Sequence, residues 1–513
     1  MTPARNDRQV AEDSIRDFYA ELRAALGPLH FGSLVVAASA RVQAGHHDPS
    51  FLRVWPSPYL LHSIELASSA CSEESGFTVD EPLIQRVLDC YRRFNDPIHE
   101  HVLRELQSVE LFLMLLDREQ LQTQFNANRF TVSRTLRLFW RKDPLPKTSA
   151  AIAGRFGFSV EDLVTTAFFG WASTMNRRTP HIPRNYGASI PESILPLRVF
   201  EKCIAELAYS RKSLAAWSAS SRDMARPLRA SSVESPFLRR PGIRLPDGWA
   251  VPRPDLMIAA IASTVMELGE AADAVALREE LGASLESYLD EVLGAGPGVI
   301  RRIPASCIRE RSTAVGCDGI YEYKDSILLV EAKAVELSAK LIAPEVLADR
   351  RCSTAHLAEG ARQVHATAVD VRRGLYDDVL SDSGKPMYGV ILTLGHFPQA
   401  NGEWMQKSVF RPQVGAARER SWPEPLAWTP QVWDTEALDR FVTLMAIEGS
   451  TPLAIFEEKR LDAQRTLGEW DRFLSIRTGG KSDPLRKFFR SPFDDFWEAR
   501  FAPVLGAPPF EEE

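Results

Sequence analysis

Residues 315–334 read VGCDGIYEYKDSILLVEAKA, and this stretch decides how the chain can be interpreted. Two apolar runs, 319–323 and 327–330, flank a polar break at 324–326. Short apolar runs joined by a few polar residues are the sequence pattern of a β-hairpin. The stretch therefore predicts two adjacent antiparallel strands.

Charged side chains stand at the start of the first strand and at the end of the second. Asp318 opens the first strand, and Glu331-Ala332-Lys333 closes the second. Because side chains alternate across a strand, Glu331 and Lys333 are expected on one face and Ala332 on the other. For Asp318 to share the face of Glu331, the pairing is expected to place it opposite Lys333, with a two-residue turn at 325–326. A carboxylate and an ammonium that end an apolar strand indicate a functional site.

The elements around the hairpin are predicted in the order α-β-β-β-α-β. A helix precedes it, with Glu286 at the edge of an apolar stripe formed by Leu281, Leu285, Tyr288, Leu289 and Val292. Residues 303–309 can form a first strand, and residues 387–394 a last one. Between the hairpin and the last strand, a second helix has the stripe Leu357, Ala361, Val364, Ala368, Val371 and Leu375. Gln363 lies off the face of that stripe.

The segment of about 271–394 resembles the PD-(D/E)XK nuclease superfamily, which has the restriction-endonuclease-like fold. Motif residues occur in the expected order on the expected elements: Leu281-Gly282-x-x-Leu285-Glu286, Asp318, Glu331-Ala332-Lys333 and Gln363. Cys317 stands where the superfamily often has proline, and Thr367 where its exonuclease-type branch tends to have tyrosine. The resemblance implies an αβββαβ core around a central mixed sheet.

The resemblance also implies a metal-dependent hydrolase that acts on phosphodiester bonds. Asp318 and Glu331 would hold Mg²⁺, for which Mn²⁺ can substitute, and the carbonyl of Ala332 would be a further ligand. Glu286 would bind a second ion or fix the position of the first. These four residues form the expected metal site.

Two further residues would serve the attacking water and the phosphate. Lys333 would orient or deprotonate the water and offset charge in the transition state. Gln363 would position the lysine, the water or the phosphate backbone. Each residue of the motif also has a structural interpretation, as a hairpin-end acid, an exposed ion pair or a solvated helix position. Their occurrence together and in order favours the catalytic interpretation.

The fold class expected for the whole chain is mixed, with large helical regions and one α/β domain. Four regions are expected: a helical region at 1–210, a basic linker or long loop rich in proline and serine at 211–255, the nuclease-like domain at 256–400, and a mostly helical extension at 401–513. The linker carries nine basic and three acidic residues between Arg211 and Arg253, which fits a solvated loop or a segment that follows phosphates.

Three other patterns favour structural interpretations. Residues 150–166 have the spacing of a helix-turn-helix, but the second helix starts with acidic residues and continues into an apolar run, so a structural helical hairpin is favoured over a DNA reader. His99 and His101 are two residues apart on a predicted helix, which points them too far apart to share an ion. The basic and aromatic residues at 481–497 favour a docked helix over stacking on single-stranded bases.

Composition bounds the location and the partners. The formal net charge of −7 over 513 residues limits contacts with nucleic acid to local patches. Six widely spaced cysteines without a CxxC pair are typical of a reducing compartment. The sequence shows no signal peptide and no apolar run long enough for a membrane span, so a cytoplasmic protein without a membrane partner is expected.

The expected function is a metal-dependent endonuclease acting on nucleic acid, with DNA as the expected substrate, in restriction or defence against foreign DNA. The helical regions would recognise the substrate, bind a protein partner or a second copy of the chain, or restrain activity. The alternative is a nucleic-acid-binding or assembly protein that retains the fold without cutting. The intact set of two acids and a lysine favours the enzyme.

Overall fold

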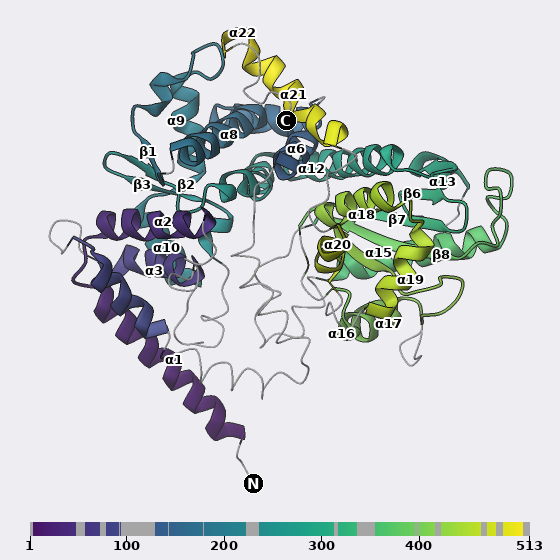
Figure 1. The fold of residues 1–513 in the computed structure, drawn as a ribbon, viewed down its shortest axis with the longest axis horizontal. Coiled ribbons are helices and arrows are strands. Elements are labelled where there is room, and N and C mark those ends of the chain that lie inside the picture. Colours follow the sequence, from purple (N-terminus) through teal and green to yellow (C-terminus); the bar gives the residue numbers. More distant parts are fainter. Residues whose placement is uncertain are drawn as a thin grey trace. The chain divides into compact units, whose positions relative to one another are not determined.

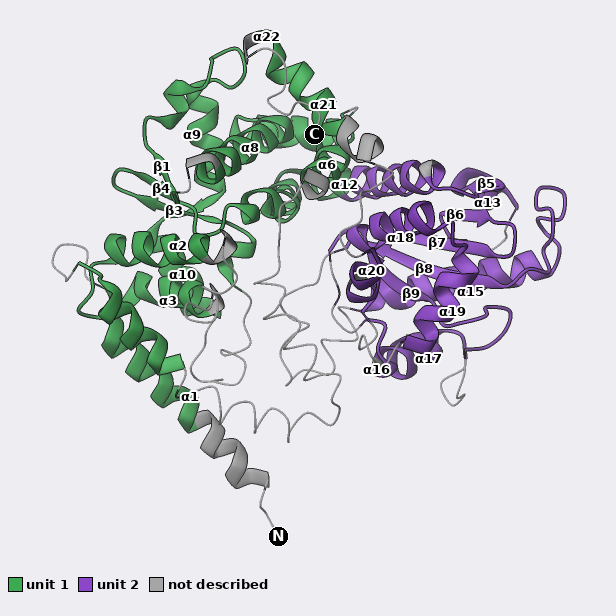
Figure 2. Cartoon of the chain, viewed as in Figure 1, with its two compact units in different colours: residues 1–277, 342–345, 492–513 green, residues 278–341, 346–491 purple. Residues whose placement is uncertain are grey.

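The computed structural model describes residues 4–47, 57–71, 78–91, 93, 129–141, 143–177, 179–221, 235–311, 316–335, 354–395, 397, 400–415, 422–462, 469–478 and 486–505. The chain divides into two compact units (Figure 2). Unit 1 comprises Met1–Leu277, Ile342–Glu345 and Pro492–Glu513, and unit 2 comprises Arg278–Leu341 and Val346–Ser491. All the predicted site residues belong to unit 2.

Unit 1 is mainly helical (Figure 1). Its helices are α1 (Ala4–Leu26), α2 (Phe31–His47), α3 (Ser57–Ala70), α6 (Arg129–Phe139), α7 (Pro146–Phe156), α8 (Val160–Arg177), η2 (Tyr186–Ser189), α9 (Leu197–Glu206), α10 (Arg211–Ser221), η3 (Pro236–Leu238), the first part of α12 (Asp255–Ala295), α21 (Arg486–Arg500) from Pro492 on, and α22 (Ala502–Leu505). The apolar stripe of α1 is buried in the core of this unit, through Ile15, Phe18, Tyr19, Leu22 and Leu26. The helical character predicted for the N-terminal region is confirmed for the described residues.

A small four-stranded sheet also belongs to unit 1, and part of it lies where a linker was expected. The strands are β1 (His181–Pro183), β2 (Ala208–Tyr209), β3 (Gly242–Leu245) and β4 (Gly248–Ala250), in the order β1-β4-β3-β2. Residues 211–255 therefore contain α10, β3 and β4 rather than a continuous linker. The prolines at 241, 246 and 252 lie outside the strands, at their ends, where a missing N–H removes no sheet hydrogen bond. Basic residues of this stretch bind protein groups, as Arg211 does at the Ser68 carbonyl.

The helix-turn-helix spacing corresponds to a structural helical hairpin, as predicted. Gly157 ends α7 with a φ of 80°, a left-handed conformation that glycine adopts without strain. The apolar side of α8 then packs against the C-terminal aromatic residues, with the ring of Phe168 5.5 Å from Phe496 and 5.4 Å from Phe501. This packing confirms that the C-terminal helix docks on the protein. His99 and His101 lie outside the described residues.

Unit 2 contains the predicted α-β-β-β-α-β order with additional elements. From residue 278 of α12 onward these are β5 (Arg301–Pro304), α13 (Ala305–Arg311), β6 (Gly319–Glu322), β7 (Ile327–Lys333), α15 (Ala355–Arg372), β8 (Met387–Thr393), α16 (Glu403–Met405), η5 (Gln406–Phe410), α17 (Arg411–Gln413), β9 (Gln431–Asp434), α18 (Thr435–Glu448), α19 (Pro452–Asp462) and α20 (Trp470–Thr478). The helices expected as a separate extension after residue 401 thus lie largely in the same unit as the hairpin.

A five-stranded mixed sheet forms the centre of unit 2, in the order β5-β6-β7-β8-β9. The pairs β5–β6 and β6–β7 are antiparallel, and β7–β8 and β8–β9 are parallel. Neighbouring residues of β8 show how helices cover it. The ring of Tyr388 lies 4.5 Å from Phe456 of α19, whereas a Cβ at Gly389 would collide with Val364 of α15. Because successive side chains point to opposite faces, α15 and α19 lie on opposite sides of the sheet.

Two details of the predicted hairpin region are wrong. The first strand ends at Pro304 instead of continuing to residue 309, and α13 begins at the next residue. Proline has no N–H to continue a strand ladder, and the residues after it can form a helical turn. The hairpin turn lies at 324–325 rather than at 325–326, because Glu322 pairs with Ile327. The pairing is therefore shifted by two residues from the predicted one.

Candidate active site

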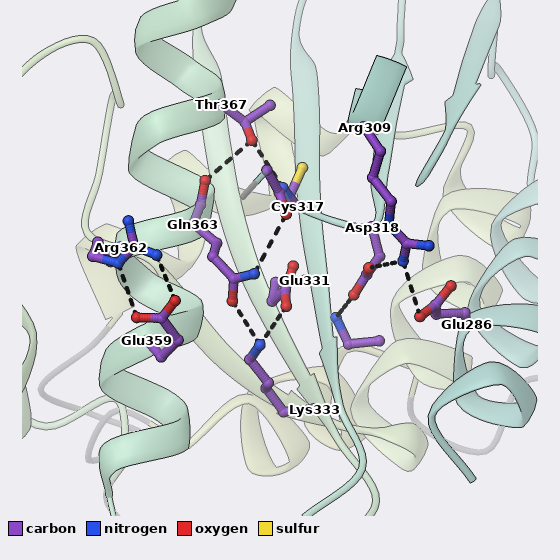
Figure 3. Close-up of polar contacts among 12 residues, drawn as sticks. Glu286, Arg309, Cys317, Asp318, Glu331, Lys333, Glu359, Arg362, Gln363 and Thr367 are labelled. Carbon is purple, nitrogen blue, oxygen red and sulfur yellow. Dashed lines mark hydrogen bonds and ion pairs between the residues drawn. The ribbon is translucent and has the colours of Figure 1, made fainter. Parts of the chain in front are cut away.

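Asp318 lies directly before β6, at the end of the strand pair. Its N–H donates to the Val330 carbonyl at 2.9 Å, and its Oδ2 accepts a hydrogen bond from the Ala332 N–H at 2.8 Å (Figure 3). Gly319 pairs with Val330, so Asp318 lies beside Glu331 and not opposite Lys333 as predicted. The shift by an even number of residues preserves the predicted outcome, because the Asp318 and Glu331 carboxylates still interact.

Glu331 is a buried carboxyl at the end of β7, with only 3% of its side chain exposed. Its Oε1 accepts a hydrogen bond from Lys333 Nζ at 2.5 Å. Its Oε2 is buried and receives no hydrogen bond from the part of the chain that the structure describes. Burial and then the charge of Asp318 raise the pKa of Glu331 to about 8, although Lys333 opposes this rise. The contact with Lys333 therefore does not offset the cost of burying this carboxyl, and its Oε2 has no donor among the described residues.

Lys333 and Gln363 join β7 to α15. Lys333 Nζ donates to Gln363 Oε1 at 2.6 Å as well as to Glu331. Gln363 Nε2 donates in turn to the Gly316 carbonyl at 3.5 Å. Gln363 is only 5% exposed, so its place off the apolar stripe is not a solvated one. The helix residue predicted to position the lysine does contact it.

Thr367, one turn after Gln363 on α15, was not among the predicted site residues. Its Oγ1 accepts a hydrogen bond from the Cys317 N–H at 2.9 Å and donates to the Gln363 carbonyl at 3.1 Å. The four-residue spacing places both side chains on one side of the helix, which is the signal that could have found Thr367. It holds the backbone immediately before Asp318. Burial raises the pKa of the Cys317 thiol to about 12, which argues against a nucleophilic role for it.

Glu286 is connected to Asp318 by Arg309, a residue that was not predicted from the sequence. Glu286 lies on α12, with 35% of its side chain exposed. Nη2 of Arg309 lies 3.6 Å from Glu286 Oε1 and 3.5 Å from Asp318 Oδ1 (Figure 3). Burial and the charge of Asp318 raise the pKa of Glu286, and Arg309 opposes the rise. Arg309 was missed because it was assigned to the end of a strand, whereas it projects from α13.

The site offers a hard divalent cation two carboxylates. Among the described residues, no group of three or more histidine, cysteine, aspartate or glutamate side chains is arranged to hold a metal ion. Mg²⁺ typically uses one or two carboxylates and completes its shell with water and substrate oxygens, so Asp318 and Glu331 are sufficient in type and number. The N–H of Ala332 points to Asp318. Within a strand, the N–H and the C=O of one residue point toward the same neighbouring strand. The Ala332 carbonyl therefore lies on the side of Asp318.

Electrostatics favour a cation here. Burial raises the pKa of Asp318, as it does for Glu331 and Glu286. The Ala332 N–H, Lys333 and Arg309 counteract the rise at Asp318 without cancelling it. Three neighbouring carboxyl groups are therefore harder to ionise than usual because of burial, and a bound cation would stabilise their ionised forms.

No helix among the described residues has the length and apolar character needed to cross a membrane.

Comparison of the chain with models of protein families, with curated proteins and with solved structures finds no match. The interpretation of the site therefore depends on its geometry.

Proposed function

We propose that unit 2 is a metal-dependent nuclease domain that hydrolyses phosphodiester bonds in DNA. The observation that carries the proposal is one contact network. Lys333 binds both Glu331 and Gln363. Asp318 is held by the N–H of Ala332, the residue between the glutamate and the lysine. A buried acid pair can hold a divalent ion and an anchored lysine can stabilise charge on the phosphate, and hydrolysis of a phosphodiester uses both functions.

The topology of unit 2 supports the restriction-endonuclease-like fold. A helix is followed by three antiparallel strands, and α15 then crosses over to the parallel strand β8. This order corresponds to the αβββαβ core, with the acid pair on β7 and just before β6. The same topology brings Gln363 of α15 to the end of β7.

Asp318 and Glu331 are the proposed carboxylate ligands, and the Ala332 carbonyl is the proposed backbone ligand. The fit rests on the buried Oε2 of Glu331, which receives no hydrogen bond from the described residues, and on the raised pKa values of the two acids. A bound Mg²⁺ would polarise a phosphoryl oxygen and make water more acidic. Ionised Asp318 and Glu331 are the forms that bind it, so affinity for the ion should increase with pH.

Lys333 would act on the attacking water and the phosphate. Its ammonium is held by two oxygens, Glu331 Oε1 and Gln363 Oε1, which fix its direction, and among the described residues they leave its third N–H available to donate. A positively charged donor fixed before the reaction stabilises charge that develops on the phosphate.

The proposal includes a cytoplasmic location, since the five cysteines that the structure describes are free thiols.

Cleavage assays on the full chain test the proposal. Supercoiled plasmid, single-stranded DNA and RNA are each incubated with Mg²⁺, with Mn²⁺ and with EDTA. We expect divalent-dependent cleavage of DNA by the wild type and its loss in Asp318→Asn, Glu331→Gln and Lys333→Met. Lys407→Met is a matched control, because Lys407 is half-exposed and pairs with Glu403, a neighbouring residue of its own helical segment outside the site. Tight binding of DNA without cleavage, equal in all variants, would instead support the non-cutting alternative.

A further inference from the structure

Arg309 lies between two acids of the candidate active site. One nitrogen, Nη2, is within 3.5 Å of Asp318 Oδ1 and 3.6 Å of Glu286 Oε1 (Figure 3). A positive charge that touches two carboxylates at once stands where a metal ion could bridge them. Neither contact is short, and both use the same nitrogen, so the guanidinium forms no bidentate pair with either acid.

The two sides of this contact differ in burial. The side chain of Asp318 is 11% exposed, whereas that of Arg309 is 65% exposed. Asp318 is also held by the Ala332 N–H, so the acid is fixed and the arginine is the movable partner. Because the guanidinium is largely exposed, water screens its contact with the acids, so an ion that binds the acids more strongly can displace it at small cost.

A second arginine of α13 provides a contrast. Arg311 binds Asp378 through both terminal nitrogens, with Nη2 2.9 Å from Oδ2. Arg311 thus has a bidentate partner outside the site, and its side chain is less exposed than that of Arg309. Two arginines on one short helix therefore differ in role, one fixed and one loosely placed at the site.

We propose that Arg309 occupies a cation position between Glu286 and Asp318, and that it competes with the divalent ion for Asp318, which is a proposed ligand of that ion. The inference rests on the proposed function, since it concerns the same site. The guanidinium supplies one positive charge to a region crowded with carboxyl groups. In the ion-free site this charge reduces the repulsion between those carboxylates. It also repels an approaching divalent ion and must move aside when that ion binds.

Metal affinity, measured without DNA, tests this competition. Mn²⁺ is titrated into the full chain, and free Mn²⁺ is followed by electron paramagnetic resonance. Arg309→Ala and Arg309→Gln should bind Mn²⁺ about three- to tenfold more tightly than the wild type, because both remove the competing charge. Arg309→Lys keeps the charge and should bind close to the wild-type affinity. Arg311→Ala is the matched control on the same helix and should bind like the wild type.

The outcomes separate this inference from the proposed function. If the wild type binds Mn²⁺ and both neutral variants bind it equally or more weakly, the competition is refuted while the metal site stands. If neither the wild type nor any variant binds Mn²⁺, the metal site fails and the inference fails with it. Thermal unfolding of each variant, expected within a few degrees of the wild type because Arg309 is exposed, shows that a change in affinity comes from the charge.

Discussion

The carboxylate of Asp318 accepts a hydrogen bond from the backbone N–H of Ala332, with 2.8 Å between Oδ2 and the nitrogen. Ala332 separates Glu331 from Lys333, so this bond attaches the acid before β6 to the peptide between the two charged residues of β7. The position of the Asp318 carboxylate is thus fixed by the backbone and not by a contact with a flexible side chain. Asp318 has two roles here, as acceptor of this hydrogen bond and as carrier of a negative charge. A substitution can distinguish them, because an amide oxygen can also accept the bond whereas only a carboxylate carries the charge.

Asp318→Asn should greatly slow cleavage while leaving the fold intact. The asparagine oxygen can still accept from Ala332, so the strand ends should stay in place. The loss of one negative charge removes a proposed ligand, and we expect cleavage of DNA to fall by at least about 100-fold, as when a group that stabilises transition-state charge is removed. Single-turnover cleavage rates and circular dichroism of both proteins measure the two effects.

Asp378→Asn is the control for this substitution. Asp378 is an exposed acid that binds Arg311 outside the site, so its change should leave cleavage within about twofold. A cleavage rate in Asp318→Asn equal to that in the control would remove Asp318 from the catalytic set.

The stability of the metal-free protein should depend on pH through Glu331. Burial raises its pKa from 4.5 to about 8, so the folded protein keeps a proton that the unfolded chain loses between these pH values. Because the folded state binds more protons in this window, the contribution of Glu331 to stability is full below pH 4.5 and is lost as the pH rises through about 8. Glu331→Gln has no such proton. The free energy of unfolding of the variant, minus that of the wild type, should therefore increase from pH 5 to pH 8.

Urea unfolding in EDTA at several pH values measures this difference. Other titrating groups are present in both proteins, so their contributions largely cancel in the comparison. A difference that stays constant across the window would show that the Glu331 carboxyl titrates near its usual pH in the folded protein. Adding Mg²⁺ should stabilise the wild type more than the variant, since the ion binds the ionised acid.

Thr367 should be required for both stability and cleavage. Its hydroxyl accepts from the buried N–H of Cys317, next to Asp318. Thr367→Val keeps the shape and leaves that N–H without a partner, which should lower the free energy of unfolding by about 1–3 kcal/mol. Thr367→Ser keeps a hydroxyl and should retain most of the cleavage rate. If the valine variant matches the serine variant in both stability and cleavage, the hydrogen bond does not position Asp318.

The elements that carry the site could be predicted because their periodicity is strong. The stripe of α12 is buried at Leu281, Leu285 and the residues that follow, and Ala295 ends the helix near the predicted glycines. The hairpin strands begin at Gly319 and Ile327 as predicted. In the helix a single face is covered by the core, so its apolar pattern determines which side chains remain for other roles. The strands β6 and β7 are buried on both faces, and their continuous apolar runs made them recognisable.

Details that depend on tertiary contacts could not be predicted from the sequence. The turn lies one residue earlier than expected, where the Asp325 carboxylate accepts a hydrogen bond from Thr451, a residue far along the chain. The strand β9 has only four residues and is stabilised by pairing with β8, so its local pattern is too short to recognise. Arg309 was missed because a seven-residue apolar and polar mixture fits a strand or a helix equally well.

Lys333 and Gln363 should differ in the size and kind of their effects on cleavage. Lys333→Met removes the donor and its charge, and we expect the single-turnover rate to fall by about 100-fold or more. Gln363→Leu leaves Lys333 bound to Glu331 only, so the ammonium loses one of its two fixed contacts, and a fall of about tenfold is expected from poorer positioning. Binding of DNA in Ca²⁺ should change little in Gln363→Leu, because the residue is buried. Equal losses in both variants would mean that Gln363 has a direct part in the reaction, whereas no loss in Lys333→Met would exclude the lysine from it.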